Sequence, residues 1–179
     1  GVDLSGKDLS YTNLTYADFN GADLSNAVIN HTIFYGAQLP YANLSDQDLS
    51  KIDFSYANLT GADISGADVT DTVFHLSILK DVNLQNADLD QAQFIQVDFT
   101  KIKNKSLAGV DLSSASLAHS NLSGVNLSGT ILIGTNFWKA DLSGQDFTVI
   151  SDTSADGVTF IETNLSNSNF EGVDMSPQQ

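Results

Sequence analysis

The side chains best suited to proton transfer or metal binding in this 179-residue chain are three histidines and 22 acids. His31, His75 and His119 lie on different outward columns or coils of the repeat described below, so they do not form one cluster. The carboxylates recur at regular intervals, whereas acid–base catalysis needs titratable groups paired in a cleft. HExxH, GxSxG and Gly-rich phosphate loops do not occur in the sequence. We therefore expect no catalytic residue, no cofactor and no metal site, and we do not expect an enzyme.

The charge of the chain excludes other classes of function. Seven lysines, no arginine and 22 acids give a formal net charge of -15. Proteins that bind a phosphate backbone need a basic face, so we expect no direct contact with nucleic acid. No run of 18 apolar residues exists, and we expect no membrane partner. No signal peptide opens the sequence, which favours a soluble protein of the cytoplasm over the periplasm or a lumen, while the absence of cysteine leaves the redox compartment open.

The elements that carry these side chains follow a period of five. From Leu4 to Phe99 an apolar residue, here called the centre, occupies every fifth position. The residue two before the centre is usually alanine, the one before it Asp or Asn, and the one after it often Ser or Thr. This period fits neither an α-helix nor a flat strand. A chain that turns a corner every five residues fits it, and four such sides close a coil.

The spacing of phenylalanine supports four sides. Phe34, Phe54, Phe74 and Phe94 recur at intervals of twenty residues, which predicts rings stacked one coil apart. The phase slips near 100–106, after which centres continue from Leu107, and again near 148–157. If the first insertion is local, Phe137 rejoins the same column. Gln47 and Gln145 stand where a small inward residue belongs, and we expect them to bond to backbone inside the coil, with a small ligand pocket as the alternative.

The unit A-[DN]-L-[ST]-x, as in Ala22-Asp23-Leu24-Ser25, resembles the pentapeptide-repeat family. The resemblance covers nearly the whole chain. It implies an all-β fold, a right-handed quadrilateral β-helix of about eight coils, forming a single domain over residues 1–179. The units look most like those of bacterial, often cyanobacterial, members without an assigned role.

Two outward faces are candidate sites. The side centred on Leu9, Ile29, Leu49, Val69 and Leu89 carries an acidic face, which consists of Asp8, Asp46, Asp48, Asp68, Asp71, Asp88 and Asp90. The neighbouring side, centred on the phenylalanines and here called the Phe side, carries an apolar face, which consists of Ile33, Tyr35, Tyr56, Val73, His75, Ile95 and Trp138. Exposed apolar residues gathered on a polar rod are typical of a protein-binding patch.

These faces leave two functions open. A non-enzymatic scaffold would bind a protein partner, of unknown identity, through the apolar face. The resemblance implies an alternative, because some pentapeptide-repeat proteins bind DNA gyrase as DNA mimics and protect it from quinolones. The acidic face could imitate duplex phosphates, although the absence of arginine and cysteine departs from those members. A homodimer through the C-terminal coil is expected on the same grounds.

Overall fold

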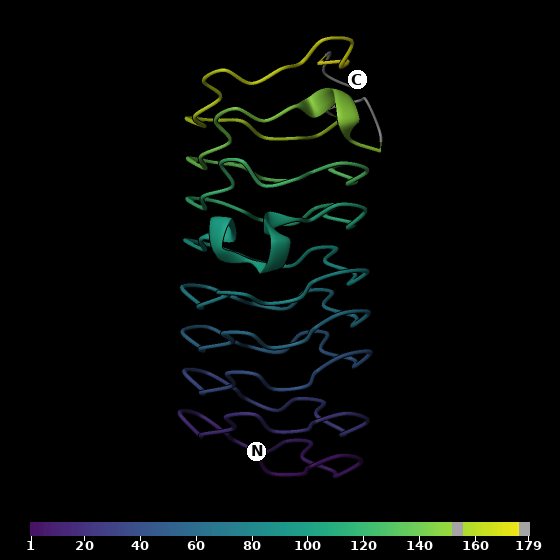
Figure 1. Ribbon diagram of the computed structural model, residues 1–179, viewed down its shortest axis with the longest axis vertical. Coiled ribbons are helices and arrows are strands. Elements are labelled where there is room, and N and C mark those ends of the chain that lie inside the picture. The colour runs from purple at the N-terminus through teal and green to yellow at the C-terminus, as the bar shows by residue number, and fades with distance from the viewer. Residues whose placement is uncertain (152–155, 176–179) are drawn as a thin grey trace.

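The backbone of the computed structural model, which describes residues 1–151 and 156–175, is paired by isolated parallel β-bridges one coil apart. Between Asp3 and Gln93 each bridge joins residues twenty apart, as Asp3 with Asp23 and Asp48 with Asp68. One coil therefore takes four five-residue sides. The coils stack into a rod with the N-terminal coil at one end and the C-terminal coil at the other (Figure 1).

Each corner is a tight turn that explains the repeat unit. The carbonyl of a centre accepts a hydrogen bond from the N–H three residues on, as Leu4 does from Lys7 at 3.0 Å. The residue two after the centre has a positive φ, +64° at Gly6 and +58° at Tyr16. The Asp or Asn before the centre closes the turn, because its Oδ1 accepts from both the N–H and the hydroxyl of the residue after the centre. Asp3 accepts from Ser5 N at 3.0 Å and from Ser5 Oγ at 2.7 Å.

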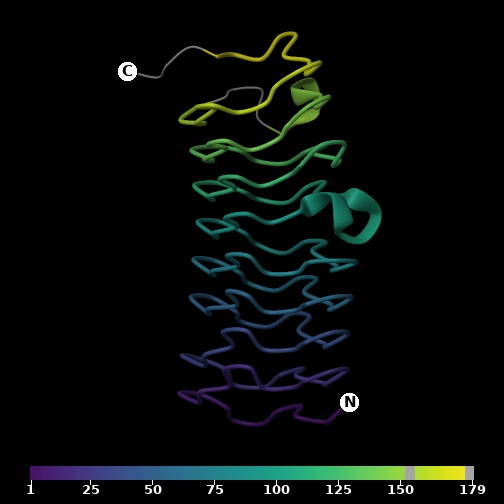
Figure 2. The same cartoon turned by 90° about the vertical axis from the view of Figure 1, so that its left-hand side faces the viewer.

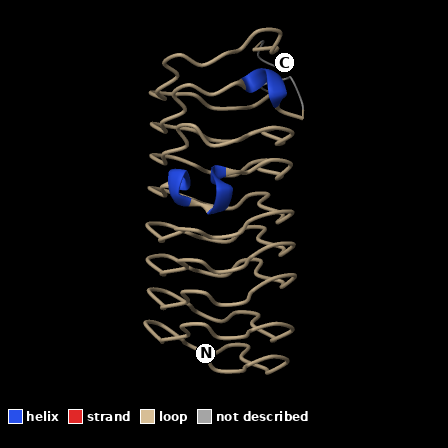
Figure 3. Cartoon of the chain, viewed as in Figure 1, coloured by secondary structure: helices blue, strands red, loops and turns tan. Residues whose placement is uncertain are grey.

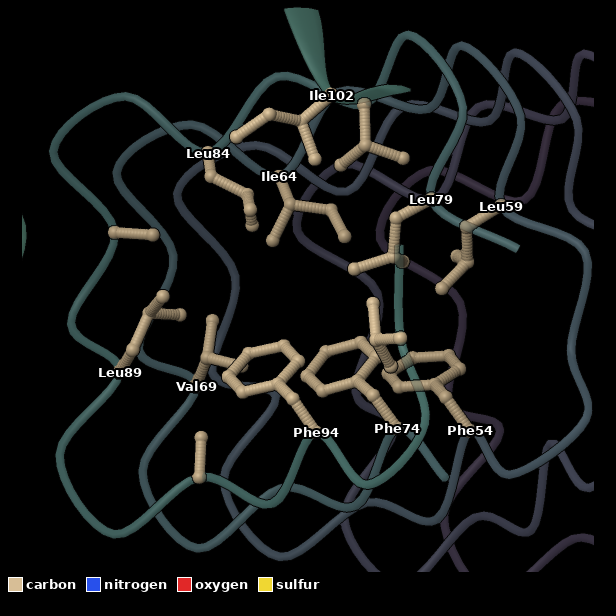
Figure 4. Close-up of a cluster of buried hydrophobic side chains, with 14 of the residues drawn as sticks. Phe54, Leu59, Ile64, Val69, Phe74, Leu79, Leu84, Leu89, Phe94 and Ile102 are labelled. Carbon is tan, nitrogen blue, oxygen red and sulfur yellow. The ribbon is translucent and has the colours of Figure 1, made fainter. Parts of the chain in front are cut away.

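The core is a stack of centres with small residues between them. Phe34, Phe54, Phe74 and Phe94 are fully buried, and successive ring centroids lie 5.2, 5.5 and 4.9 Å apart in stacked geometry. Figure 4 shows three of these rings against the aliphatic centres of the other sides. The predicted phenylalanine column is therefore confirmed. A large side chain at each centre and the residue two before it, most often alanine but isoleucine at Ile52, fill the narrow interior.

The inward glutamines bond to backbone, as the sequence predicted. Gln145 Nε2 donates to the carbonyl of Leu122 at 2.6 Å. The amide of Gln47, in the orientation that satisfies its neighbours, donates to the carbonyl of Ala27 at 2.9 Å. These carbonyls belong to the preceding coil, so the buried amides link coils and need no ligand.

Three short 3-10 helices mark the interruptions, and they are the helices of the described residues (Figure 3). The helices η1 (Phe99–Lys101) and η2 (Lys103–Lys105) form a bulge that protrudes from the rod (Figure 2). Across this bulge the bridges join residues 23 apart, as Gln93 with Ser116, and above it they return to twenty, as Ser116 with Asn136. The three extra residues are therefore local, and Phe137 rejoins the Phe side.

The helix η3 (Phe147–Val149) begins the second interruption. Part of the predicted interruption, residues 152–155, lies outside the described residues. Beyond it, the bridge between Asn136 and Thr159 places Phe160 next to Phe137, with ring centroids 5.8 Å apart and the rings 11° from parallel. The Phe side therefore continues through both interruptions.

Removing one ring from the stack should weaken the rod. We expect Phe54→Ala to lower the free energy of unfolding by about 3–5 kcal/mol, because it leaves a cavity between two stacked rings. Chemical denaturation followed by circular dichroism measures this change. Asn30→Ala, at an exposed position of a neighbouring side, is the control and should change little. Equal midpoints for Phe54→Ala and the unchanged protein would contradict the stacked core.

Candidate functional site

The acidic face contains one continuous row of aspartates. Bridges join Asp48 to Asp68, Asp68 to Asp88, and Asp88 to Asp111, so these four residues, the Asp ladder, stand on successive coils. Sequence reasoning missed Asp111 because it lies beyond the three-residue insertion. Asp8 is separated from the ladder, since its bridge partner on the next coil is Val28.

The other members of the acidic face border the Asp ladder. Asp46 and Asp71 occupy the corners at the two ends of this side, with φ of +55° and +58°. Asp90 follows the centre Leu89, and its carbonyl accepts from the N–H of Asp71 at 3.1 Å. The face is therefore acidic along its middle and at both edges.

Several aspartates on the other sides alternate with amides, which distinguishes them from the Asp ladder, although Asp3 and Asp23 are bridged to each other. Asn43 Nδ2 donates to Asp23 Oδ1 at 3.2 Å, and Asn83 Nδ2 donates to Asp63 Oδ1 at 3.0 Å. Within the Asp ladder each carboxylate instead faces another carboxylate on the next coil. Among the described residues no lysine or histidine nitrogen lies within 4 Å of these carboxylates. The Asp ladder therefore stacks four like charges in one row, whereas Asp3 and Asp23 stack two.

The fold itself does not require charge at these positions. Asp48 Oδ1 accepts from Ser50 N at 3.0 Å and Asp68 Oδ1 from Thr70 N at 3.0 Å. Asn43 makes the equivalent bond to Ser45 N at 3.2 Å with its amide oxygen. Ser10 donates two hydrogen bonds to the Asp8 carboxylate, one from its hydroxyl and one from its N–H. Both bonds lower the pKa of the Asp8 carboxyl below its ordinary value, and the hydroxyl has the larger effect. Either aspartate or asparagine can therefore close the turn, so the turn does not require the negative charge of the Asp ladder.

The predicted apolar face is divided by a carboxylate. Bridges join Ile33 to Asp53 and Asp53 to Val73, so Asp53 lies between the two apolar residues. On the same coil the position after the centre is taken by Ser55, which is buried. The lower part keeps Ile33, Tyr35 and Tyr56, while Val73, His75, Ile95 and Trp138 lie on coils above.

The upper part is longer than the sequence indicated. Backbone hydrogen bonds relate the residue that follows each centre on five successive coils. These residues, which we call the apolar ladder, are His75, Ile95, Ala118, Trp138 and Ile161. Ala118 and Ile161 were not predicted, although each directly follows a centre, as Trp138 does; of these two, Ala118 is buried. Ile161 is 62% exposed and Trp138 39% exposed.

Polar groups border Trp138 and hold its ring. Lys139 Nζ lies 4.8 Å from the ring centroid, and the same nitrogen is 3.5 Å from Glu162 Oε2. The His119 ring meets the indole edge to face, with centroids 4.9 Å apart. An aromatic residue with a charged rim is the usual composition of the centre of a protein interface.

Two classes of site do not occur in the described part of the chain. No group of three or more His, Asp or Glu side chains there could hold a metal ion. Within the same residues, no helix is long and apolar enough to cross a lipid bilayer.

The charge stacking of the Asp ladder yields a stability test. We expect Asp68→Asn to raise Tm by about 1–2 °C, because the amide keeps the turn bond and can donate to a neighbouring carboxylate. The gain should shrink at high salt. Asp63→Asn is the matched control, since Asp63 already accepts from Asn83. Thermal melts at low and high salt measure the change in Tm of each variant. An equal change for Asp68→Asn and Asp63→Asn would refute repulsion within the Asp ladder.

Comparisons with known proteins place this geometry in a family. The family described as Pentapeptide repeats (8 copies) matches residues 8–40, 37–75, 77–101, 111–148 and 146–176. The unmatched stretch between 101 and 111 contains η2 of the bulge. A search of curated protein sequences finds no match to the chain.

Solved structures share the fold. Full-length QnrB1, a plasmid-mediated fluoroquinolone resistance protein, is 14% identical, with 99% of this chain and 92% of that chain covered and a TM-score of 0.55. A trypsin-treated form of QnrB1 is 19% identical, with coverages of 99% and 89% and a TM-score of 0.54.

A third similar structure is HetL, a pentapeptide-repeat protein involved in heterocyst differentiation regulation in the cyanobacterium Nostoc sp. strain PCC 7120. It is 24% identical, with coverages of 94% and 86% and a TM-score of 0.41. The repeat units, the four-sided coil and the match over most of the sequence agree. The chain belongs to the pentapeptide-repeat family, whose fold is a right-handed quadrilateral β-helix.

Proposed function

We propose that this protein is a non-enzymatic scaffold, a single solenoid domain of about eight coils, that binds another protein through its Phe side. The apolar ladder carries the proposal. Trp138 and Ile161 are exposed on adjacent coils, His75 and Ile95 are half-buried, and Ala118 is buried. A partner could therefore contact this row, mainly at Trp138 and Ile161, without crossing a charged residue of the same row.

The composition of this row favours a protein partner. Interfaces concentrate their binding energy in a few aromatic residues surrounded by contacts that exclude water. Trp138 supplies such a residue, with Ile95 and Ile161 on the same row and the Lys139–Glu162 pair at its edge. Single exposed apolar residues are common on any protein, whereas an aligned row is not.

A pull-down from lysate of the source cell tests the apolar ladder. We expect Trp138→Ser and Ile161→Ser to remove the same partner from the set that the unchanged protein retains, because both truncate one contact surface. Ile78→Ser is the matched control, since Ile78 is 52% exposed on a different side. A partner set that is identical for all four proteins would overturn the proposal.

A second candidate function rests on the Asp ladder. Four carboxylates stacked without amides between them resemble the regular charge of a nucleic-acid backbone, and QnrB1 shares the fold. In this alternative the protein would bind DNA gyrase or another topoisomerase as a DNA mimic. A homodimer through the C-terminal coil would lengthen the acidic surface.

A supercoiling assay distinguishes the alternative. If the Asp ladder acts as a DNA mimic, the protein should inhibit gyrase or protect it from a quinolone at micromolar concentration. The effect should weaken steeply with salt. The double change Asp68→Asn and Asp88→Asn should reduce it further, while Asp23→Asn on another side should not. No effect of the unchanged protein on gyrase would remove this alternative and leave the scaffold proposal standing.

A further inference from the structure

The lower part of the Phe side carries a second arrangement, made of three tyrosines and one carboxylate. We propose that Tyr16, Tyr35, Tyr56 and Asp53 form a docking site for an arginine side chain on a basic segment of the partner protein. This inference rests on the proposed function, because it names the chemistry of a partner that binds the same side of the rod.

The three tyrosines, here the tyrosine cluster, are held in contact with one another. Tyr16 and Tyr35 meet edge to face with ring centroids 5.9 Å apart, and Tyr35 and Tyr56 lie 5.2 Å apart at an angle of 51°. Gly36 makes room for this packing, because the Tyr16 ring occupies the space where a Cβ on Gly36 would stand. The rings nevertheless face water, since Tyr16 is 69% and Tyr56 51% exposed.

Asp53 lies beside this cluster without a cationic partner. Its bridge partners on the adjacent coils are the apolar Ile33 and Val73. One carboxylate oxygen, Oδ1, accepts from Ser55 N at 2.8 Å. Within residues 1–151 and 156–175, no lysine or histidine nitrogen lies within 4 Å of Asp53. A half-buried charge between apolar neighbours is poorly solvated, so a cation supplied by a partner would gain more here than at an ordinary surface carboxylate.

Tyr35 lies close to this carboxylate. Burial by its neighbours raises the pKa of Tyr35, and the nearby Tyr16, Tyr56 and Asp53 add to that increase. Aromatic faces and a negative charge thus act on the same small region. That combination attracts cations, because the ring faces carry negative electrostatic potential.

Arginine fits this region better than lysine does. Its planar guanidinium can stack on a tyrosine ring while its N–H groups pair with a carboxylate, whereas an ammonium group acts as a point charge. The net charge of -15 also favours approach of a basic segment over an acidic one. The Phe side would then bind a partner at two places, through an apolar contact at Trp138 and an arginine contact at Asp53.

Three synthetic peptides of equal length test the proposal. They alternate glycine with arginine, with lysine, or with citrulline, which is planar but uncharged. Titration into isotopically labelled protein at physiological ionic strength, followed by NMR, reports both affinity and location. We expect the arginine peptide to bind about three- to five-fold more tightly than the lysine peptide and the citrulline peptide to bind more weakly than both. The shifted resonances should include those of the tyrosine cluster.

Matched variants locate the site. Asp53→Asn keeps the oxygen that accepts from Ser55 and should lower arginine-peptide affinity about three- to five-fold, whereas Asp48→Asn, an equivalent change on the acidic face, should not. Tyr56→Asn suits the positive φ of that corner and should also lower affinity, while Tyr41→Asn, at another exposed corner, should not.

Equal affinities for the arginine and lysine peptides would overturn the proposal, as would equal losses with Asp53→Asn and Asp48→Asn, because both outcomes mean attraction by net charge alone. These results are independent of the pull-down with Trp138→Ser. A partner lost with Trp138→Ser but no preference for arginine would refute this inference and keep the scaffold proposal. A preference for arginine, together with no partner lost from the Trp138→Ser variant, would keep this inference and overturn the scaffold proposal.

Discussion

The structure depends on one constraint: every fifth residue, the centre, is buried in a narrow interior that it shares with the residue two before it. That residue is most often alanine, although Ile52 is buried beside Phe54, and the chain must turn between steps. The turn is closed by Asp or Asn and requires a positive φ, which is met by glycine at some corners and by strained residues at others. Backbone pairing to the next coil then holds every step in register.

Because the coils are held in this register, the order of residue types along the sequence determines the pattern of residues on the surface. Residues twenty apart become neighbours, so a residue type repeated at that interval becomes a row on one side of the rod. Where an asparagine stands twenty residues after an aspartate, the two side chains form a hydrogen bond, as Asn83 does with Asp63. Aspartate repeated gives the Asp ladder, where like charges remain stacked. The same rule places Trp138 and Ile161 together and isolates Asp53 between Ile33 and Val73.

The phenylalanine column, the inward bonds of Gln47 and Gln145, and the locations of the interruptions could all be predicted, because each follows from a period that counts residues. Asp111 could not, because three extra residues can either stay in a local bulge or shift every later side. The bridge between Gln93 and Ser116 shows that the three extra residues stay in a local bulge. The contact of Tyr16 with Tyr35 was also not predictable, since it depends on the space that Gly36 leaves open on the next coil.

The sequence by itself determined the four-sided coil, the pentapeptide-repeat family and the excess of negative charge, because burial and turn chemistry act within five residues. Only the tertiary structure decided which outward residues stand together. Rows on the surface join residues twenty or more apart, and their partners change with each insertion. The Asp ladder, the apolar ladder and the carboxylate beside the tyrosine cluster therefore exist only once the coils are stacked.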